Sequence, residues 1–196
     1  KLLEDGKFVN IYDNFEGDEL EAVKKMQFLT TKPVIYAANV SETDLKNGND
    51  YVNKVKEYAK THNADVVIIS AAIEAELSQL DEAEAKDYLN ELGVASSGIE
   101  RMIKSVYHLL DLRTYITAGE KEVRAWTIHA GDTAPKAAGV IHTDFERGFI
   151  RAEVVSYDDF VSSGSLNAAK EKGLVRLEGK DYVVQDGDIM HFRFNV

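Results

Sequence analysis

The fold of the first half of the chain is decided by residues 33–42, PVIYAANVSE. Residues 34–38 form a nearly continuous apolar run, which indicates a buried β-strand. A second apolar run follows at residues 66–69, and between the two runs apolar side chains recur at helical spacing from Tyr51 to Ala59. A strand, a helix of about a dozen residues and a second strand form a βαβ unit, and the right-handed crossover rule makes its strands parallel. We therefore predict a parallel, α/β sheet here.

Three amphipathic helices are predicted around this unit. The first spans residues 18–31, with acidic residues at its favoured N-terminal end. The second is expected to run without a break from Glu74 to Leu92 as one acidic helix. Ser97 and Glu100 match a capping box at the start of the third helix, and an apolar stripe follows them.

The sequence pattern changes at about Leu112. β-branched and aromatic residues at 113–117 and 123–128 predict the two strands of a hairpin. Thr133 and Pro135 then predict the start of a helix. Further strands are expected at residues 150–155, 175–177, 182–184 and 189–194, with a turn at residues 185–188. A hairpin, a helix and returning strands in this order favour a β-grasp, ubiquitin-like fold of the α+β class.

Composition limits the kinds of partner. The formal net charge is −11, of which residues 1–111 carry −9 and residues 112–196 carry −2. Phosphate contacts require Lys and Arg, so any RNA contact must be local, and the C-terminal part is the better candidate. The chain has no cysteine, no apolar run of membrane-spanning length and no signal peptide, which suits a cytoplasmic protein. Because it lacks an initiator Met, we expect it to begin inside a longer protein.

Two short loops carry the first functional signal. Asn39 to Glu42 directly follow the first predicted strand, and Ser70 to Ala72 directly follow the second. Open parallel sheets bind ligands beyond the carboxyl ends of their strands, so both loops can meet one ligand. Alternatively, Asn39 and Ser41 only cap the strand and start a turn.

The loop pair resembles the base-reading loops of P-loop GTPases, Asn-Lys-x-Asp and Ser-Ala-Lys. Here Val40 replaces the Lys and Glu42 replaces the Asp, a departure typical of the YchF subfamily of Obg-like ATPases. The resemblance implies a preference for ATP over GTP, and Glu42 loses its guanine-reading role if the ligand is ATP. It also implies base-binding roles for Asn39, Val40, Glu42, Ser70, Ala71 and Ala72.

A longer resemblance to YchF proteins covers the second half. It includes residues 113–119, 122–128, 139–152, 179–182 and 186–188. This segment is similar to the TGS domain, a β-grasp module associated with contact to RNA or the ribosome. We expect RNA or ribosome contact from a set of basic residues beside Trp126, Phe145 and Phe149. The set is Arg124, Lys136, His142, Arg147 and Arg151. Alternatively, the aromatic residues fill the small core, the arginines are ordinary surface charges and an N–H of His142 holds a loop in place.

The resemblance divides the chain into three parts. Residues 1–31 correspond to the end of a helical, coiled-coil insertion, residues 32–111 to the C-terminal part of an incomplete P-loop nucleotide-binding domain, and residues 112–196 to the TGS domain. The Gly-x-x-x-x-Gly-Lys-Ser/Thr motif and the Mg²⁺ ligands are not found in the sequence. We therefore expect the longer parent protein to use ATP or GTP with Mg²⁺, and this chain alone to be inactive in hydrolysis.

Other interpretations follow from what the sequence lacks. The five histidines show no metal-ligand spacing, so no metal site is predicted. A truncated sheet exposes an edge and apolar surface, which favours mispacking or dimerisation through that surface, or pairing with the missing N-terminal P-loop segment. The alternative function is a protein–protein interaction module in which the nucleotide loops are only structural.

Overall fold

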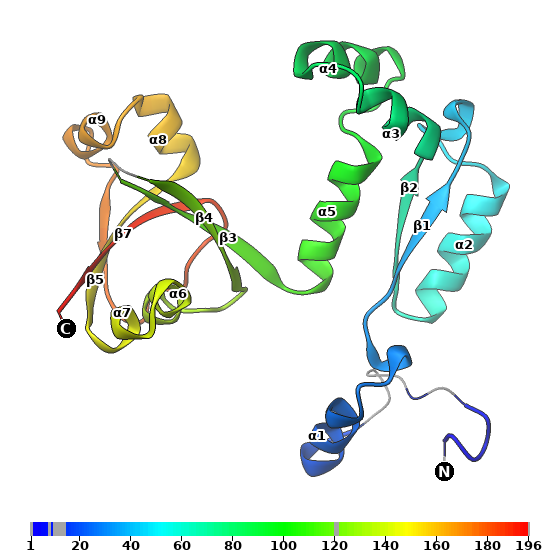
Figure 1. Cartoon of the computed structure of the whole chain (residues 1–196), viewed down its shortest axis with the longest axis horizontal. Coiled ribbons are helices and arrows are strands. Elements are labelled where there is room, and N and C mark those ends of the chain that lie inside the picture. Colours follow the sequence, from blue (N-terminus) through cyan, green and yellow to red (C-terminus); the bar gives the residue numbers. More distant parts are fainter. Residues whose placement is uncertain (1, 8, 10–14, 120–121, 196) are drawn as a thin grey trace. The chain divides into compact units, whose positions relative to one another are not determined.

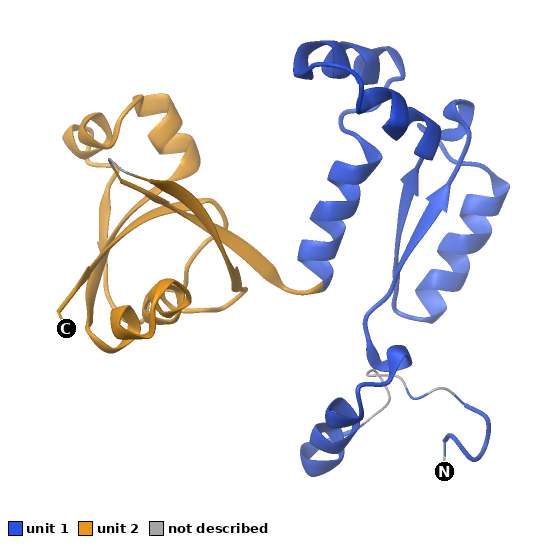
Figure 2. Ribbon diagram, viewed as in Figure 1, with its two compact units in different colours: residues 1–109 blue, residues 110–196 orange. Residues whose placement is uncertain are grey.

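The computed structural model describes residues 2–7, 9, 15–119 and 122–195. The chain forms two compact units, Lys1–Leu109 and Leu110–Val196, which Figure 2 distinguishes by colour. Part of the predicted segment 1–31 and the tip of the predicted hairpin, residues 120–121, lie outside the described residues. We therefore describe each unit by itself.

The first unit is built on the predicted βαβ arrangement. Strands β1 and β2 pair in parallel, from Ile35 opposite Asp65 to Asn39 opposite Ile69, which confirms the expected parallel sheet. The Asn49 side chain caps the intervening helix α2 by accepting bonds from the backbone N–H groups of Tyr51 and Val52. The elements up to this point are α1 (Gly17–Met26), η1 (Leu29–Thr31), β1 (Ile35–Asn39), η2 (Glu42–Asp44), α2 (Asp50–Thr61) and β2 (Asp65–Ile69) (Figure 1).

The single helix predicted from Glu74 to Leu92 is wrong. The structure has two helices there, α3 (Ala71–Leu77) and α4 (Glu82–Glu91). The break occurs because Asp81 forms a capping box with Glu84, which starts a new helix within a continuous apolar periodicity. The Tyr88 hydroxyl of α4 donates to the Glu76 carboxylate of α3 at 2.5 Å, and this bond raises the pKa of Tyr88 to about 12.

Helix α5 (Gly98–Leu109) starts where the capping residues predict. The Ser97 hydroxyl accepts a bond from the Glu100 N–H at 3.0 Å, while the Glu100 carboxylate pairs with Lys104 at 2.6 Å. Arg101 ties the helix to the sheet by donating to the Ile68 carbonyl at 2.9 Å. Of the predicted capping box, the bond from the Glu100 N–H to the Ser97 hydroxyl is therefore present. The Glu100 carboxylate pairs with Lys104, in the next turn of the helix.

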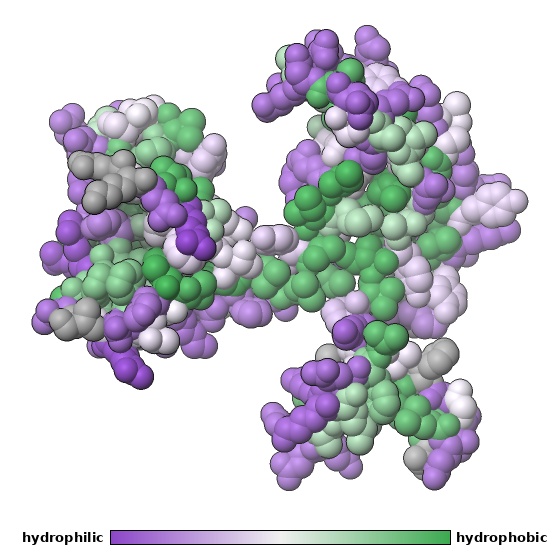
Figure 3. Space-filling model, in the orientation of Figure 1, coloured by the Kyte–Doolittle hydropathy of each residue, from purple (hydrophilic) through white to green (hydrophobic). Residues whose placement is uncertain are grey.

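Much of the apolar stripe on α5 faces outward. Ile99 and Ile103 are 56% and 53% exposed, and Val106 is also exposed. Figure 3 shows hydrophobic surface along this helix. Among the described residues of this unit the buried hydrophobic side chains are few, namely Val9, Leu45, Val52, Ala59, Val67 and Ile73. A two-stranded sheet is too narrow to cover both helices that pack on it, because neighbouring strands lie only about 5 Å apart.

The second unit contains a five-stranded mixed sheet with the strand order β4-β3-β7-β5-β6. The hairpin partners β3 and β4 are antiparallel, β3 pairs with β7 in parallel, and β5 is antiparallel to both β6 and β7. The strands are β3 (Leu112–Ala118), β4 (Val123–His129), β5 (Phe149–Ser156), β6 (Arg176–Glu178) and β7 (Asp188–Phe194). The strand predicted at residues 182–184 is reduced to an isolated bridge between Thr133 and Val183.

Four helices accompany this sheet among the described residues, and three of them were not predicted. The predicted one is α6 (Ala134–Ile141), with Thr133 at its N-cap. The others are α7 (Thr143–Arg147), α8 (Tyr157–Ser163) and α9 (Leu166–Glu171). These helices are too short to show a clear 3.6-residue periodicity, and capping side chains such as Ser156 and Ser165 mark their starts.

Each face of the sheet has its own core. On one face, Tyr115, Ile128, Val154 and Phe192 pack with the buried alanines of α6. The fully buried Tyr115 donates its hydroxyl to the Ala137 carbonyl at 2.8 Å, which joins strand to helix. On the other face, a smaller cluster of Val155, Ile189 and Ala169 lies under α8 and α9. The four helices of the second unit thus lie on opposite faces of its sheet (Figure 1). Helices α6 and α7 lie on the first face, and α8 and α9 lie on the second.

Candidate functional site

The parallel pairing of β1 and β2 brings the two predicted nucleotide loops together. The Asn39 side-chain oxygen accepts a hydrogen bond from the Ala71 N–H at 2.9 Å, across 32 residues of sequence. The Val40 N–H donates to the Ile69 carbonyl at 2.9 Å, which extends the strand pairing by one bond. The loops therefore share one edge of the sheet, beyond the carboxyl ends of both strands.

The second loop forms the start of α3. Ser70 is the N-cap residue in extended conformation and is only 1% exposed, so its side chain faces the interior. Ala71 and Ala72 are exposed in the first turn, while Ile73 is buried beneath them. This loop can therefore offer backbone and methyl groups to a ligand, but the Ser70 hydroxyl is turned away.

The first loop continues into the short helix η2. The Ser41 hydroxyl bonds to Thr43 at 2.9 Å and to the Asp44 carboxylate at 3.2 Å. Asn49 donates to the same carboxylate at 2.8 Å, which closes the loop onto the start of α2. Glu42, the first residue of η2, is exposed. Ser41 thus makes local bonds that hold a turn, as the structural interpretation of this segment also expects, whereas the bond of Asn39 joins the two loops.

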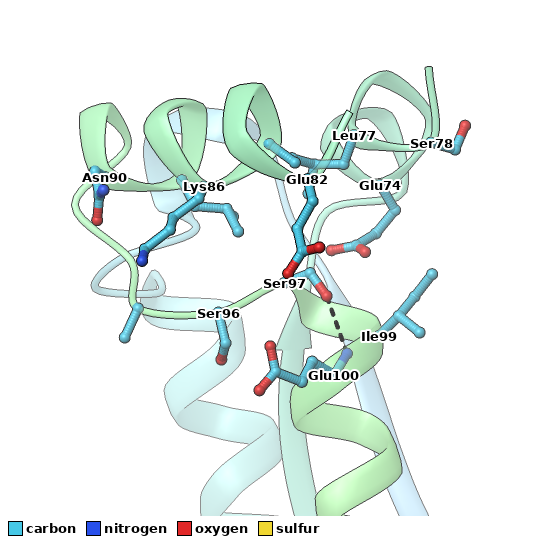
Figure 4. Close-up of a pocket in the computed structure, with 13 residues that line it drawn as sticks. Glu74, Leu77, Ser78, Glu82, Lys86, Asn90, Ser96, Ser97, Ile99 and Glu100 are labelled. Carbon is cyan, nitrogen blue, oxygen red and sulfur yellow. Dashed lines mark hydrogen bonds between the residues drawn. The ribbon is translucent and has the colours of Figure 1, made fainter. Parts of the chain in front are cut away.

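A cavity of about 530 Å³ lies between α3, α4 and the start of α5. Figure 4 shows the carboxylates of Glu74 and Glu82 pointing toward Ser97. Glu74 is engaged, since its carboxylate accepts the Gly98 N–H at 2.6 Å. The predicted base-binding residues do not line this cavity. Sequence reasoning missed it because a single helix over residues 74–92 leaves no room for it.

The basic residues predicted to contact RNA are divided between different parts of the second unit. The Arg124 guanidinium lies 4.1 Å from the centre of the Trp126 ring, on the face covered by α6. Lys136 pairs with Asp132 at 3.6 Å, and Arg147 is exposed at the end of α7. Arg151 lies on the opposite face, because it stands directly across from Arg193 and two residues before Glu153.

His142 has a structural role at the start of α7. Its ring Nδ1 accepts a hydrogen bond from the Asp144 N–H at 3.2 Å, which makes it the N-cap of the helix. The ring remains exposed and lies 6.2 Å from Phe145, centre to centre. Of the aromatic residues expected beside the basic set, Phe149 is only 4% exposed and belongs to the core. Phe145 instead stacks on Phe194, with ring centres 3.8 Å apart.

The part of the chain that the structure describes contains no group of three or more His, Cys, Asp or Glu residues placed to hold a metal ion. Nor does any described helix have the length and apolar character needed to cross a membrane.

A parallel strand pair whose following loops converge at one edge is the arrangement that α/β proteins use to bind nucleotides. Comparisons with known proteins identify relatives of this chain. Residues 112–195 match the family described as YchF-GTPase_C, protein of unknown function (DUF933). The "Ribosome-binding ATPase YchF" of Haemophilus ducreyi is 58% identical over 181 residues, which cover 92% of this chain and 50% of that protein.

Two further relatives extend the match. The "Obg-like ATPase 1" of Homo sapiens is 42% identical over 197 residues, covering 99% of this chain and 50% of the relative. The structure of the Schizosaccharomyces pombe YchF GTPase superposes with a TM-score of 0.76 at 37% identity, over 93% of this chain and 49% of that one. The chain therefore belongs to the YchF family of Obg-like ATPases and matches its C-terminal part. It spans about half the length of the curated relatives it matches.

Proposed function

We propose that this chain is the C-terminal part of a nucleotide-binding protein, with ATP preferred over GTP, that couples nucleotide binding to contact with the ribosome or RNA. The observation that carries the proposal is the bond between the Asn39 side chain and the Ala71 N–H, which joins the two loops that we propose to contact the base. Family membership supports the coupling, since bacterial relatives are named as ribosome-binding ATPases.

In this proposal the first unit supplies only the base-binding side of a nucleotide site. Asn39 holds the second loop in place, Val40 and Ala72 contact the base, and Glu42 lies at the rim. Phosphate and Mg²⁺ contacts come from the missing N-terminal P-loop segment, so this chain alone does not hydrolyse nucleotide. The same segment is proposed to cover β1 and the exposed stripe of α5, and without it two copies of the chain can associate through that surface.

The second unit is proposed to be a TGS domain of the β-grasp class. Its sheet order supports this, because a hairpin whose first strand pairs in parallel with the last strand places the N- and C-terminal strands side by side. The unit carries the proposed ribosome or RNA contact and acts in the cytoplasm.

One observation favours the alternative, a protein–protein interaction module. Ser70 is buried and the Ala71 N–H is already bonded to Asn39, so part of the loop pair satisfies itself without a ligand. In that case the loops complete the fold, and the second unit docks a protein.

Isothermal titration calorimetry with ATP and with GTP tests the proposal, on this chain and on a full-length family member. We expect nucleotide binding by the full-length protein, with ATP favoured, and none by this chain. In the full-length protein, substitution of Ala72 by Asp should weaken nucleotide binding by about tenfold, because it adds a charge beside the base. Unchanged affinity in that variant would favour the interaction module.

A further inference from the structure

The cavity between α3, α4 and the start of α5 is separate from the predicted base-binding residues. Helix α4 has no buried residue, and in α3 only Ile73 is buried. An amphipathic helix normally covers its apolar stripe with a neighbouring element. Ala85 and Leu89 of α4 lie four residues apart, on one face of the helix, and both line the cavity. The apolar face of α4 is therefore turned toward the cavity rather than toward a packed core.

The neighbouring helices add further apolar walls. Leu77 of α3 and Ile99 of α5 both line the cavity (Figure 4). Ile99 is 56% exposed, so it still offers much of its surface to a partner. The volume of about 530 Å³ lies within the range of cavities that bind ligands, and such cavities are mostly apolar with a few polar groups.

Three carboxylates accompany these apolar walls, those of Glu74, Glu82 and Glu100. Glu74 accepts the Gly98 N–H at 2.6 Å, and Glu100 pairs with Lys104. Glu82 is exposed and makes no hydrogen bond or ion pair within the described part of the chain. At least one carboxylate at the cavity is therefore free to pair with a cation from outside.

The segment around the cavity is strongly acidic. Residues 71–100 contain eight acidic side chains and one basic side chain, Lys86, which gives this segment a net charge of −7 in a chain of −11. Figure 4 shows the Lys86 amine on the Asn90 side of the cavity, away from the Glu74 and Glu82 carboxylates. Such a surface repels phosphate groups, and it repels a second copy of this acidic chain as well. Charge complementarity therefore favours a cationic partner.

We propose that this cavity docks a basic, amphipathic segment of a partner protein. The apolar side chains of that segment lie between Leu77, Leu89 and Ile99, and its lysine or arginine side chains pair with Glu82 and Glu100. A helix with one apolar and one charged face that lies in a groove is a common mode of recognition between proteins. The proposal concerns the first unit only, and it depends neither on nucleotide binding nor on the proposed RNA contact.

Fluorescence anisotropy with a labelled synthetic peptide tests the proposal on the whole chain. The probe is a helical peptide of roughly 14 residues, about four turns, with leucine on one face and lysine on the other. In one matched peptide glutamate replaces each lysine, and in a second peptide serine replaces each leucine. We expect only the leucine–lysine peptide to bind well, and we expect added salt to weaken its binding.

Two pairs of variants locate the binding. Glu82→Gln removes the free carboxylate, and its control is Glu91→Gln, at the other end of the same helix and outside the cavity. Ile99→Gln removes an apolar wall, and its control is Ile103→Gln, a similarly exposed isoleucine of α5 that does not line the cavity. Thermal melting of each variant confirms that it is folded.

We expect Glu82→Gln to weaken peptide binding by about threefold, because it loses an exposed ion pair. Ile99→Gln should weaken binding by about tenfold, because it loses an apolar contact that the peptide buries. Each control should change the affinity by less than about twofold. The full-length protein should bind the peptide as this chain does.

Four outcomes would overturn the proposal. Equal losses within either pair of variants would mean that binding follows the overall charge or the outer stripe of α5. Equal binding of the serine peptide would mean that the apolar walls are not used. Binding by this chain but not by the full-length protein would mean that the rest of the protein covers the cavity. Absence of binding by the wild-type chain would also overturn it, because the probe offers both kinds of side chain that the cavity is proposed to accept.

Discussion

The two units of this chain differ in how completely their sheets are covered. In the second unit, five strands carry helices on both faces, and the larger core includes the fully buried Tyr115 and Met190. In the first unit, two strands support α2 and α5, and apolar residues such as Ile103 remain half exposed. Burial of apolar surface is the main favourable term in folding, so we expect the second unit to be the more stable.

The difference shows that a segment can keep its caps and backbone bonds while much of its apolar surface stays exposed. Helix α5 has its capping serine and its tie from Arg101 to the sheet, yet its most apolar stripe faces solvent. Caps and backbone bonds specify where a helix lies, whereas a stripe of apolar residues specifies what should cover it. The following predictions test this contrast, starting with the largest effect.

Tyr115→Ala should reduce the free energy of unfolding of the second unit by about 4 kcal/mol, because it leaves a cavity in a closed core. Urea denaturation followed by near-ultraviolet circular dichroism measures the loss. Tyr115→Phe is the control and should cost about 1 kcal/mol, the value of its bond to the Ala137 carbonyl. Equal losses for both variants would contradict the packing role of the ring.

Asn39→Ala should destabilise the first unit by about 1 kcal/mol, because it removes the side-chain acceptor at the start of α3. Asn39→Asp keeps an acceptor oxygen and should retain most of the stability. The readout is the urea midpoint of the first unit. If Asn39→Ala unfolds at the wild-type midpoint, the bond between the loops does not stabilise the fold.

The Glu153 carboxylate makes the second unit sensitive to acid. Bonds from Lys170 and Arg193 lower its pKa from 4.5 to about 2. A depressed carboxyl pKa gives stability that is fully present above about pH 4.5 and is lost as the pH falls toward 2. Since both cationic partners are about half exposed, we expect a contribution of about 1 kcal/mol after allowance for solvent screening.

Glu153→Gln checks this contribution by comparing urea midpoints at pH 7 and at about pH 3. The variant should be less stable than wild type at pH 7, and the gap should narrow in acid. A gap that stays constant with pH would mean that packing, not charge, explains the effect.

Ile103→Gln should change the stability of this chain by less than about 0.5 kcal/mol, because the side chain is 53% exposed. It should nevertheless reduce self-association of the chain, as measured by sedimentation velocity. The matched control is Lys104→Gln, one residue along the helix on its charged surface. Equal effects of the two variants on association would contradict self-association through the apolar stripe of α5.

Sequence reasoning succeeded where one apolar run or one alternating pattern corresponds to one element. Alternation and apolar runs located β1, β2 and the hairpin of β3 and β4, and the crossover rule gave the parallel pairing of the first two. It failed where a local bond overrides a longer pattern. The apolar periodicity of residues 74–92 continues through the Asp81 cap, so the periodicity alone does not predict that the helix ends there.

The candidate sites show the same limit. The order of the loops along the chain was enough to predict that Asn39 and Ser70–Ala72 lie together, because parallel strands end at one edge. The grouping of Arg151 with Arg124 could not be checked by alternation alone, because a β-bulge at Ile150 shifts every later residue of β5 to the other face. The cations near Arg151 are Arg193 of β7 and Lys170 of α9. Both lie far from Arg151 along the sequence, so no local sequence pattern predicts that they are neighbours.

Hydrogen exchange followed by mass spectrometry tests the central contrast most directly, on this chain alone and within a full-length family member. Our account predicts strong protection of β3, β5 and β7 in both proteins, and protection of β1 and α5 that rises sharply only in the full-length protein, where the missing segment covers them. Equal protection of β1 and α5 in both proteins would contradict it, because the first unit would then be complete without its partner.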